Sequence, residues 1–312
     1  MPEPLLQVNN LKMYFPVRSG IFLRQAGWVK AVDDVSFNIY PGETLGLVGE
    51  SGCGKSTIGK SIVRLLKPTG GSILFNGQNI ATLSQRKMRP LRPHIQMVFQ
   101  DPAESLNQRQ SIGQIVAEPF VIHRMGTPAE RREWVRGLLD RVGLPDSAID
   151  RFPFEFSGGQ RQRIGIARAL IMNPKLIIAD ECISALDVSI QAQVVNLMKD
   201  IQQETGTAYL FIAHDLSMVK YISDRIGVLH LGHLLETGTT EEIFENPIHP
   251  YTRSLLSAIP MPNPRLERKK KLLVYDPAMH DYTQEAPQWR ELRPSHWVLC
   301  SEQEAKDWLA EM

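Results

Sequence analysis

The stretch that decides the fold covers residues 44–57 and reads TLGLVGESGCGKST. Its first five residues are apolar without alternation, as expected of a strand that is covered on both faces. Residues 49–56 match the pattern GxxxxGK[ST], and helical periodicity follows, with Ile58, Ile62 and Leu65 expected to face inward. A strand, a glycine-rich loop and a helix in this order are typical of a phosphate-binding loop.

The residue types in this loop suit a phosphate for simple physical reasons. Glycine lets backbone N–H groups curl around an anion without Cβ clashes, and the following helix points the positive end of its dipole at the same anion. Lys55 would bridge the β- and γ-phosphates of a nucleotide, Ser56 would ligate Mg²⁺, and Thr57 would donate to the α-phosphate. The candidate ligands are Gly49, Glu50, Ser51, Gly52, Cys53, Gly54, Lys55, Ser56 and Thr57. The alternative is a glycine turn before a helix, which needs no ligand.

A second candidate element is the aliphatic run Leu176–Ala179, which ends in two acids, Asp180 and Glu181. Side chains alternate along a strand, so neighbouring acids at its end can serve different functions. Asp180 is placed to hold the shell of a Mg²⁺ ion through water, and Glu181 to polarise an attacking water as general base. Taken alone, such a strand end is equally often a solvated turn, so this interpretation depends on the phosphate-binding loop.

Composition and charge are those of an ordinary globular protein, with 312 residues, 43% hydrophobic and 22% charged. The 35 Lys and Arg against 34 Asp and Glu leave a net charge of +1, so no global field attracts nucleic acid or anionic lipid. Cys53, Cys182 and Cys300 form no CxxC pair, which argues against a disulfide framework or a zinc site and favours a reducing cytosol. We find no secretory leader and no apolar run approaching ~20 residues, and therefore expect any membrane association to be peripheral, through a partner.

Apolar runs and helical patterns alternate along the chain, which predicts an α/β core with a largely parallel sheet. A capping box at residues 127–130 opens a helix that reaches about Val142, and another helix is expected from Asp187 to Gly206. Residues 109–151 show helical periodicity without a clear strand, which indicates an all-helical insertion. The expected strands are Leu5–Val8, Val35–Ile39, Thr44–Val48, Ser72–Phe75, Ile95–Phe99, Leu176–Ala179, Ala208–Ala213 and Ile226–Leu231.

The character of the chain changes after Pro247, where further prolines precede the basic run Arg265–Lys271. We therefore divide the chain into a catalytic domain, residues 1–246, and a C-terminal extension, residues 247–312. The basic run could touch anionic lipid, although such runs are more often solvated, flexible stretches.

The element that points to a family is Phe156–Arg163, FSGGQRQR, which precedes an amphipathic segment. The motifs follow in the order phosphate-binding loop, Gln100, residues 157–160, Asp180 with Glu181, residues 184–187 and His214. Their order, spacing and type resemble the nucleotide-binding subunits of ABC transporters over roughly the first 245 residues. The resemblance implies a P-loop NTPase fold of the ABC type, with a mixed sheet core, an antiparallel β subdomain and a helical subdomain at about residues 105–172.

The same resemblance implies roles for residues that mean little when taken alone. Gln100 would ligate Mg²⁺ and sense the γ-phosphate, in a loop that touches the permease, and His214 would hydrogen-bond the γ-phosphate. Ser157, Gly159 and Gln160 would contact the γ-phosphate of the ATP that the opposite subunit holds, again at a helix N-terminus. The resemblance thus implies a dimer in which each subunit completes the other's pocket.

Two further expectations concern the dimer interface and the adenine. Asp187 would cross the interface. An aromatic residue ahead of the glycine loop would stack on adenine; Tyr14 is our choice, with Phe15 and Trp28 as alternatives, and each is as readily a core residue.

One departure from the family pattern follows the second acid. The family commonly has proline, often followed by threonine, where this chain has Cys182 and Ile183. Proline would stiffen the turn but supplies no reacting group, so activity is expected to persist with a less certain placement of Glu181. A reactive thiol at Cys182 is the alternative, although nothing nearby in sequence argues for a depressed pKa.

Residues 246–260, NPIHPYTRSLLSAIP, resemble the junction in ATP-binding subunits of oligopeptide and dipeptide importers. We expect His249–Pro260 to form a short helix on the catalytic domain with Leu255 and Leu256 facing inward. The resemblance implies an ATPase at the cytoplasmic face of the membrane, paired with an identical or different ATPase subunit and with two permease subunits, and indirectly with an extracytoplasmic binding protein. The alternatives are another cargo, such as a nickel complex, a soluble ABC ATPase acting on DNA or ribosomes, and a regulatory subunit that does not hydrolyse nucleotide.

Overall fold

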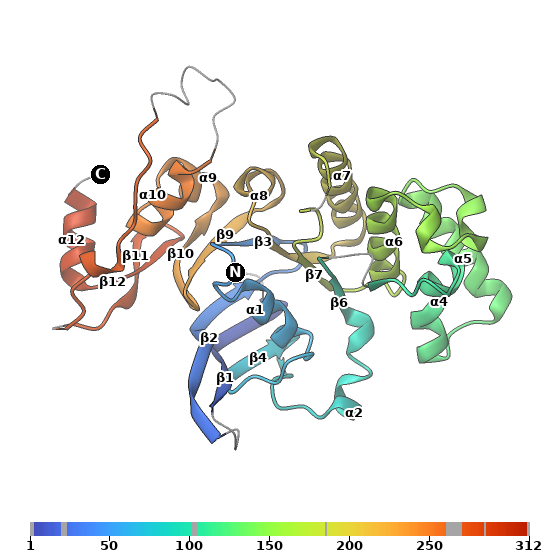
Figure 1. The fold of residues 1–312 in the computed structure, drawn as a ribbon, viewed down its shortest axis with the longest axis horizontal. Coiled ribbons are helices and arrows are strands. Elements are labelled where there is room, and N and C mark those ends of the chain that lie inside the picture. Colours follow the sequence, from blue (N-terminus) through green and yellow to red (C-terminus); the bar gives the residue numbers. More distant parts are fainter. Residues whose placement is uncertain are drawn as a thin grey trace.

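The computed structural model describes residues 3–19, 24–100, 105–184, 186–259, 270–283 and 285–310. Asp101, Ala185 and residues 260–269, which hold most of the basic run, lie outside these ranges. Within them, no helix combines the length and the apolar character that crossing a membrane requires. Figure 1 shows a central sheet between an all-helical lobe and a C-terminal lobe, with a smaller sheet below.

The centre of the molecule is an eight-stranded mixed sheet. Its strands lie in the order β11 (Gln288–Arg293), β12 (His296–Cys300), β10 (His233–Thr239), β9 (Arg225–His230), β3 (Thr44–Val48), β8 (Ala208–Ile212), β7 (Leu176–Asp180) and β6 (Ile95–Val98). The strands from β9 to β6 run parallel, and the remaining pairs are antiparallel. The mixed sheet that the resemblance implied is confirmed.

The parallel strands are buried on both faces, which explains why their sequences do not alternate. Along β7, Leu176 and Ile178 belong to one hydrophobic cluster, and Ile177 and Ala179 to the other. Every residue of β3 and β7 is buried. The prediction of two central strands covered on both sides is confirmed.

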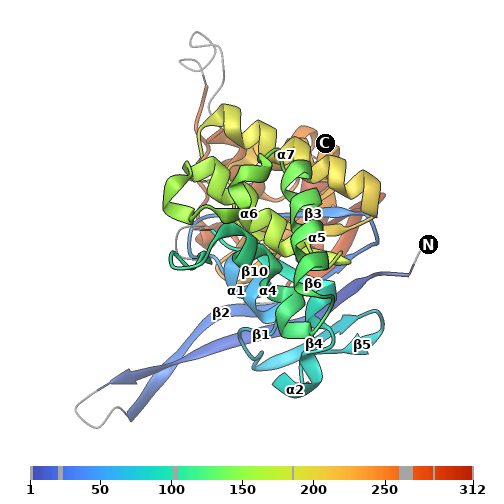
Figure 2. The same ribbon diagram turned by 90° about the vertical axis from the view of Figure 1, so that its right-hand side faces the viewer.

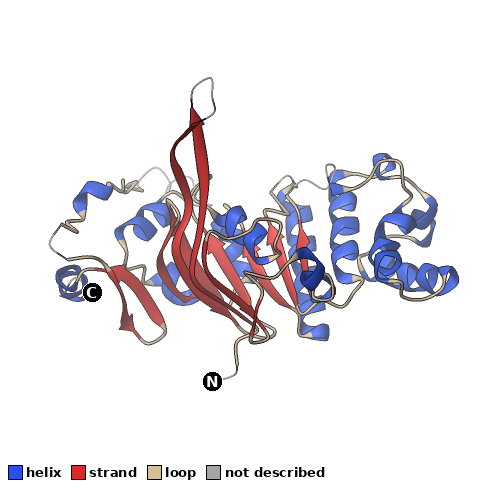
Figure 3. Ribbon diagram, turned by 90° about the horizontal axis from the view of Figure 1, so that it is seen from below, coloured by secondary structure: helices blue, strands red, loops and turns tan. Residues whose placement is uncertain are grey.

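The second sheet is antiparallel, with the order β2 (Arg24–Ile39), β1 (Leu6–Ser19), β4 (Gly70–Phe75) and β5 (Gln78–Asn79). Its first two strands form a long hairpin that projects beyond the body of the molecule (Figure 3). Sequence periodicity predicted only the inner ends of this hairpin, Leu5–Val8 and Val35–Ile39. The register shifts at several points between Val8 and Arg18, which breaks the two-residue period that the prediction used.

The helices of the catalytic domain include one compact lobe made of α4 (Ile112–His123), α5 (Pro128–Arg141) and α6 (Gly158–Leu170), which faces the viewer in Figure 2. The α5 helix has the predicted capping box at Thr127 and ends at the cap residue Val142. The prediction of an all-helical insertion is confirmed over its described residues. The other helices are α1 (Lys55–Ile62), α2 (Gln85–Met88), α7 (Val188–Thr205), α8 (Leu216–Ile222) and α9 (Thr240–Glu245), with 3₁₀ turns at Arg92–His94, Asp146–Asp150 and Pro153–Glu155.

One prediction about α1 is wrong. Ile58 and Ile62 are fully buried as expected, but Leu65 is 52% exposed. The helix ends at Ile62, and Arg64 takes a positive φ of 59°, which turns the chain away before Leu65. Arg64 Nε donates to the carbonyl of Ile80 over 2.9 Å, which fixes this early turn.

The C-terminal extension is joined to the central sheet. Its strands β11 and β12 extend that sheet beyond β10, and its helices are α10 (Pro250–Ser257) and α12 (Glu302–Ala310), with a 3₁₀ turn at Pro277–Met279. The short helix expected at His249–Pro260 is therefore present over its described residues. Leu255 and Leu256 pack half-buried against the main core, but Tyr251 and Thr252 are the deeply buried residues of α10.

Candidate active site

The phosphate-binding loop connects β3 to α1 and has a backbone that requires glycine at two points. Gly49 and Gly54 have φ values of 149° and 110°. A Cβ atom on Gly49 would lie 2.0 Å from the carbonyl oxygen of Leu229, and one on Gly54 would lie 2.2 Å from that of Ala31. The loop is therefore wedged between strands of both sheets, and any side chain at these positions would displace it.

Lys55 is folded back onto the loop that it follows. Its side chain is buried, and Nζ donates to the carbonyl oxygens of Gly49 over 2.7 Å and Glu50 over 2.9 Å. Among the described residues, no side chain caps the start of α1. The unpaired N–H groups of this helix start and a lysine ammonium thus meet at one place, which is the arrangement that binds phosphate.

Ser56, in the first turn of α1, and Asp180, the last residue of β7, form the next pair. Ser56 Oγ donates to Asp180 Oδ1 over 2.7 Å. Asp180 is 3% exposed, and this burial raises the pKa of its carboxyl, because a buried carboxylate loses its hydration. A hydroxyl and a carboxylate are ligands that Mg²⁺ prefers, and a bound cation would offset the cost of burying the charge.

Glu181 lies beside two residues that are distant in sequence. Its Oε2 accepts a hydrogen bond from Gln100 Nε2 over 2.8 Å and lies 3.8 Å from His214 Nδ1. These three residues follow β6, β7 and β8, whose parallel carboxyl ends lie at one edge of the sheet. Glu181 has a positive φ of 45°, and its N–H donates to the carbonyl of Ile212 over 2.9 Å, so a turn in the left-handed region aims its side chain.

Residues 157–160 form a different surface. Ser157 caps α6 in a reciprocal capping box with Gln160, and both side chains are exposed. A Cβ atom on Gly159 would lie 2.6 Å from Ile190 Cγ2, so glycine allows α6 to pack closely on α7. In the described part of the chain, no hydrogen bond links residues 157–160 to the phosphate-binding loop.

Comparison with known proteins shows to which family a chain with this site belongs. A family model described as "ABC transporter" matches residues 32–184, and one described as "Oligopeptide/dipeptide transporter, C-terminal region" matches residues 235–284. The oligopeptide transport ATP-binding protein OppF of Bacillus subtilis is 56% identical over 309 residues, which cover 98% of this chain and 99% of the relative. The chain belongs to the ABC transporter family, among its oligopeptide and dipeptide transport ATP-binding proteins.

Other relatives agree with this membership. The oligopeptide transport ATP-binding protein OppF of Streptococcus mutans is 54% identical over 97% of each chain. The solved structure of the ATP-binding cassette MJ0796 in a dimeric post-hydrolysis state, bound to ADP and Pi, aligns with a TM-score of 0.68 at 28% identity, covering 75% of this chain and 98% of that one. The chain is thus an ABC-type ATPase with an ATP-binding cassette fold.

The structure describes all three candidates for the adenine-stacking aromatic of this cassette. Tyr14 is half-buried, its hydroxyl is hydrogen-bonded to Asp33, and Lys30 Nζ lies 5.5 Å from its ring centre. The Asp33 contact raises the pKa of Tyr14 to about 12. Phe15 and Trp28 are 36% and 53% exposed. The assignment to Tyr14 stays a prediction, since none of these contacts involves a nucleotide.

Burial argues against the alternative role of Cys182 as a reactive thiol. The side chain is 2% exposed, and burial raises the pKa of its thiol to about 12. Cys182 therefore acts as a small apolar residue of the hydrophobic core. In the described ranges, no group of three or more histidine, cysteine or acidic residues could hold a metal ion.

Asp187 caps α7 and accepts a hydrogen bond from the N–H of Ile190 over 3.0 Å, and α7 ends at Gly206 as predicted. Sequence reasoning missed one contact of the phosphate-binding loop, from Glu50 N to the hydroxyl of Tyr251, over 3.2 Å. The motif around Tyr251 had indicated the lineage of the chain, but nothing in its spacing indicated a partner 201 residues away.

Proposed function

We propose that this ATPase powers the uptake of oligopeptides or dipeptides through a partner membrane permease. The observation that supports it best is the convergence of Glu181, Gln100 and His214 at the edge of the sheet that also carries Ser56 and Asp180. The relatives, named as oligopeptide and dipeptide transport ATP-binding proteins, supply the cargo class.

Nucleotide and metal would be held side by side at this edge. The backbone from Gly49 to Thr57 and Lys55 would surround the phosphates of ATP. Ser56, Gln100 and, through water, Asp180 would hold Mg²⁺, which when bound neutralises charge on the β- and γ-phosphates. Lys55 must leave the carbonyls of Gly49 and Glu50 to reach the phosphates, and the N–H groups at the start of α1 remain free to donate.

The hydrolytic step would depend on Glu181 and His214. Glu181, aimed by its turn and held by Gln100, would accept a proton from the attacking water. His214, whose side chain is 56% exposed, would reorient to hydrogen-bond the γ-phosphate. The 3.8 Å between His214 Nδ1 and Glu181 keeps both groups at one reacting centre.

The site is completed by a second ATPase subunit in this proposal. Ser157 and Gln160 are exposed on the helical lobe. Together with Gly159, they would contact the γ-phosphate of the ATP that a partner subunit binds. Asp187 would cross the interface between the two subunits. The partner is a second copy or a related ATPase, and each pair would drive two permease subunits at the cytoplasmic face of the membrane, with a binding protein on the opposite side. Closing on ATP and opening after hydrolysis would provide the mechanical stroke, because ATP binds the closed state better.

The decisive test replaces the proposed general base. Glu181→Gln keeps the hydrogen-bonding shape but removes the proton acceptor, so ATP hydrolysis should fall by about a hundredfold or more while ATP binding persists. Phosphate release measures the first quantity and calorimetry with ATP the second, and size-exclusion chromatography with ATP should show an accumulated dimer. Hydrolysis at the wild-type rate would overturn the assignment of Glu181.

The cargo is tested separately through the partners. Co-purification with two multi-span membrane proteins, together with uptake of labelled peptides in a transport assay, would support the proposal. Uptake of a nickel complex in place of peptides would retain the motor and replace the cargo.

A further inference from the structure

The C-terminal extension touches the phosphate-binding loop directly. Tyr251, in α10, accepts a hydrogen bond from the backbone N–H of Glu50 over 3.2 Å, and its side chain is 2% exposed. The carbonyl of the same residue, Glu50, accepts from Lys55 Nζ over 2.9 Å. Glu50, the second residue of the loop, is therefore hydrogen-bonded through both its N–H and its carbonyl. The contact to its N–H comes from Tyr251, outside residues 1–246.

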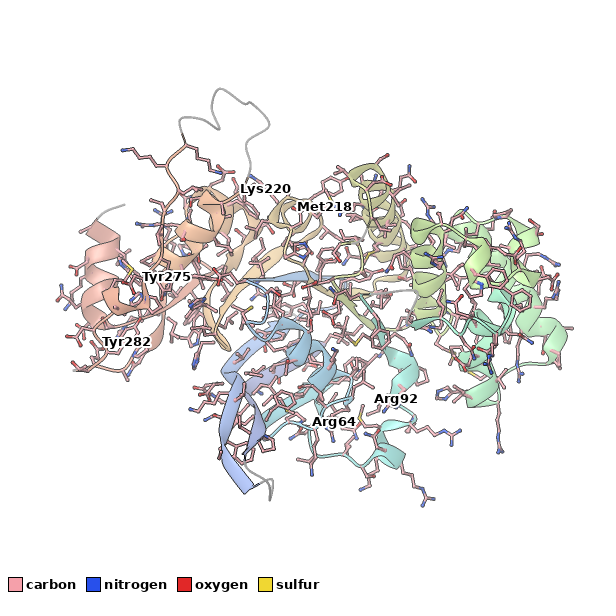
Figure 4. The ribbon with its side chains drawn as sticks, viewed as in Figure 1. Arg64, Arg92, Met218, Lys220, Tyr275 and Tyr282 are labelled. Atoms are coloured by element: carbon pink, nitrogen blue, oxygen red, sulfur yellow. The ribbon has the colours of Figure 1, made fainter. Side chains whose placement is uncertain are left out.

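The ring of Tyr251 is fixed by its aromatic neighbours. It lies 4.1 Å from the ring of His230, at the end of β9, and 5.3 Å from that of Tyr275 in an edge-on arrangement. Tyr275 and Tyr282 both lie on the C-terminal side of the molecule, away from the helical lobe (Figure 4). Because the ring is packed by residues of the catalytic domain and of the extension, the position of the hydroxyl is well defined.

The helix that carries Tyr251 is itself anchored by a buried carboxylate. Glu236, in β10, is fully buried and accepts hydrogen bonds from the N–H groups of Ile248 over 2.8 Å and His249 over 3.1 Å. Its Oε1 also lies 2.6 Å from His296 Nε2 in β12. His249 Nδ1 then accepts from the N–H of Tyr251 over 3.1 Å, so a continuous set of contacts joins the sheet to the tyrosine.

We propose that Tyr251 is a positioning residue for nucleotide binding, through which the C-terminal extension holds the phosphate-binding loop in its ATP-ready shape. This inference rests on the proposed function, since it concerns the same ATP site. A loop that is already ordered loses less conformational freedom when its N–H groups close on phosphate, so it binds more tightly. Tyr251 bonds the Glu50 N–H, and in the described part of the chain neither residue is hydrogen-bonded to Glu181, Gln100 or His214, so the effect falls on nucleotide affinity rather than on the chemical step.

The test is Tyr251→Phe in the full chain, which removes the hydroxyl and keeps the ring between His230 and Tyr275. Loss of one neutral hydrogen bond should weaken ADP binding about fivefold by calorimetry and raise KM for ATP by a similar factor, with kcat unchanged. The matched control is Tyr209→Phe, because Tyr209 is equally buried and its hydroxyl has no hydrogen-bond partner in the described part of the chain. The control should bind ADP as the wild type does.

A second readout is hydrogen exchange of the Glu50 amide in the nucleotide-free protein. Tyr251→Phe should accelerate exchange at Glu50 and leave the amide of Ile58, which donates to Gly54 O, unchanged. Wild-type ADP affinity in folded Tyr251→Phe overturns the inference, as does an unprotected Glu50 amide in the wild-type chain, a result that stands even if the variant does not fold. A wild-type chain that hydrolyses no ATP would instead overturn the proposed function.

Discussion

Asp180 shows at the scale of one residue how burial prepares a site for a cation. Burial disfavours its carboxylate, so its pKa is raised, and the folded protein holds a proton more tightly than the unfolded chain does. The free energy of unfolding should therefore fall as pH rises from the ordinary carboxyl pKa through the raised value, and level off above it. A buried carboxylate lowers the free energy of unfolding by itself, and a bound cation would offset that cost, which suits a metal-binding role for Asp180.

Replacing Asp180 with asparagine separates these two effects. Asp180→Asn keeps an acceptor for Ser56 Oγ but cannot ionise, so the nucleotide-free variant should lose the part of the pH dependence that Asp180 causes. Its thermal midpoint at neutral pH should equal or exceed that of the wild type, while Mg²⁺-dependent hydrolysis falls by about a hundredfold or more. Differential scanning calorimetry from pH 4 to 8 and phosphate release measure the two quantities. A variant destabilised at neutral pH would contradict the role given to the buried charge.

Four residues of the proposed chemistry were predicted from local sequence patterns, whereas Gln100 and His214 were assigned only through the family resemblance, and the roles of all six stay predictions. A glycine pattern places Lys55 and Ser56, and a strand end places Asp180 and Glu181, so few long-range contacts are needed. The hydroxyl of Tyr251 could not be assigned in this way, since its contact with Glu50 depends on how two distant segments pack. The choice of Tyr14 over Phe15 and Trp28 as the adenine-stacking aromatic stays a prediction for the same reason.

At the scale of elements, the parallel strands, including β6 at one edge of the central sheet, were predicted from their apolar runs. The outer part of the β1–β2 hairpin and the strands β10, β11 and β12 were not. The outer part of the β1–β2 hairpin carries exposed residues and register shifts, so its period of two is lost. β11 and β12 lie at the edge of the central sheet, beyond β10, and nothing in their local sequence indicates that they join it. A division of the chain at residue 246 therefore separates parts that share one sheet.

The joint between these parts depends on Glu236, whose carboxylate receives two backbone N–H groups ahead of α10. Glu236→Ala should lower the free energy of unfolding by about 3 kcal/mol, because buried donors at Ile248 and His249 lose their acceptor. Glu236→Gln, which keeps one acceptor oxygen, should cost less. Urea denaturation gives both values, and the exposed Glu241→Ala serves as a control with an expected change within about 0.5 kcal/mol. Equal stabilities of the two alanine variants would contradict this role.

At the scale of the whole molecule, the two halves of the proposed reaction site lie on different lobes. The phosphate-binding loop lies between the sheets, whereas Ser157 caps α6 on the helical lobe (Figure 1). Residues 157–160 present exposed polar groups and a helix start to solvent, an arrangement that suits the phosphate of a neighbouring subunit. One chain therefore carries both halves of the reaction site. In the proposed dimer, its phosphate-binding loop faces residues 157–160 of the partner, and its own residues 157–160 face the partner's phosphate-binding loop.

This division can be tested by complementation between two inactive variants of the full chain. Lys55→Ala damages the loop and keeps residues 157–160, whereas Ser157→Arg places a bulky cation on the exposed helix start and keeps the loop. Each alone should lose hydrolysis by about a hundredfold or more, and Ser157→Arg should still bind ATP.

A dimer of the two variants contains one pocket built from an intact loop and an intact helix start, and one pocket damaged twice. If the wild-type chain hydrolyses ATP as a homodimer, mixing the variants should therefore restore part of its rate, which phosphate release measures against mixing ratio. Ser111→Arg is the matched control, because Ser111 caps α4 with the same kind of capping box but lies outside the motif, so this variant should keep its activity. A mixture as inactive as its components, beside an active wild type, would mean that each chain completes its pocket alone.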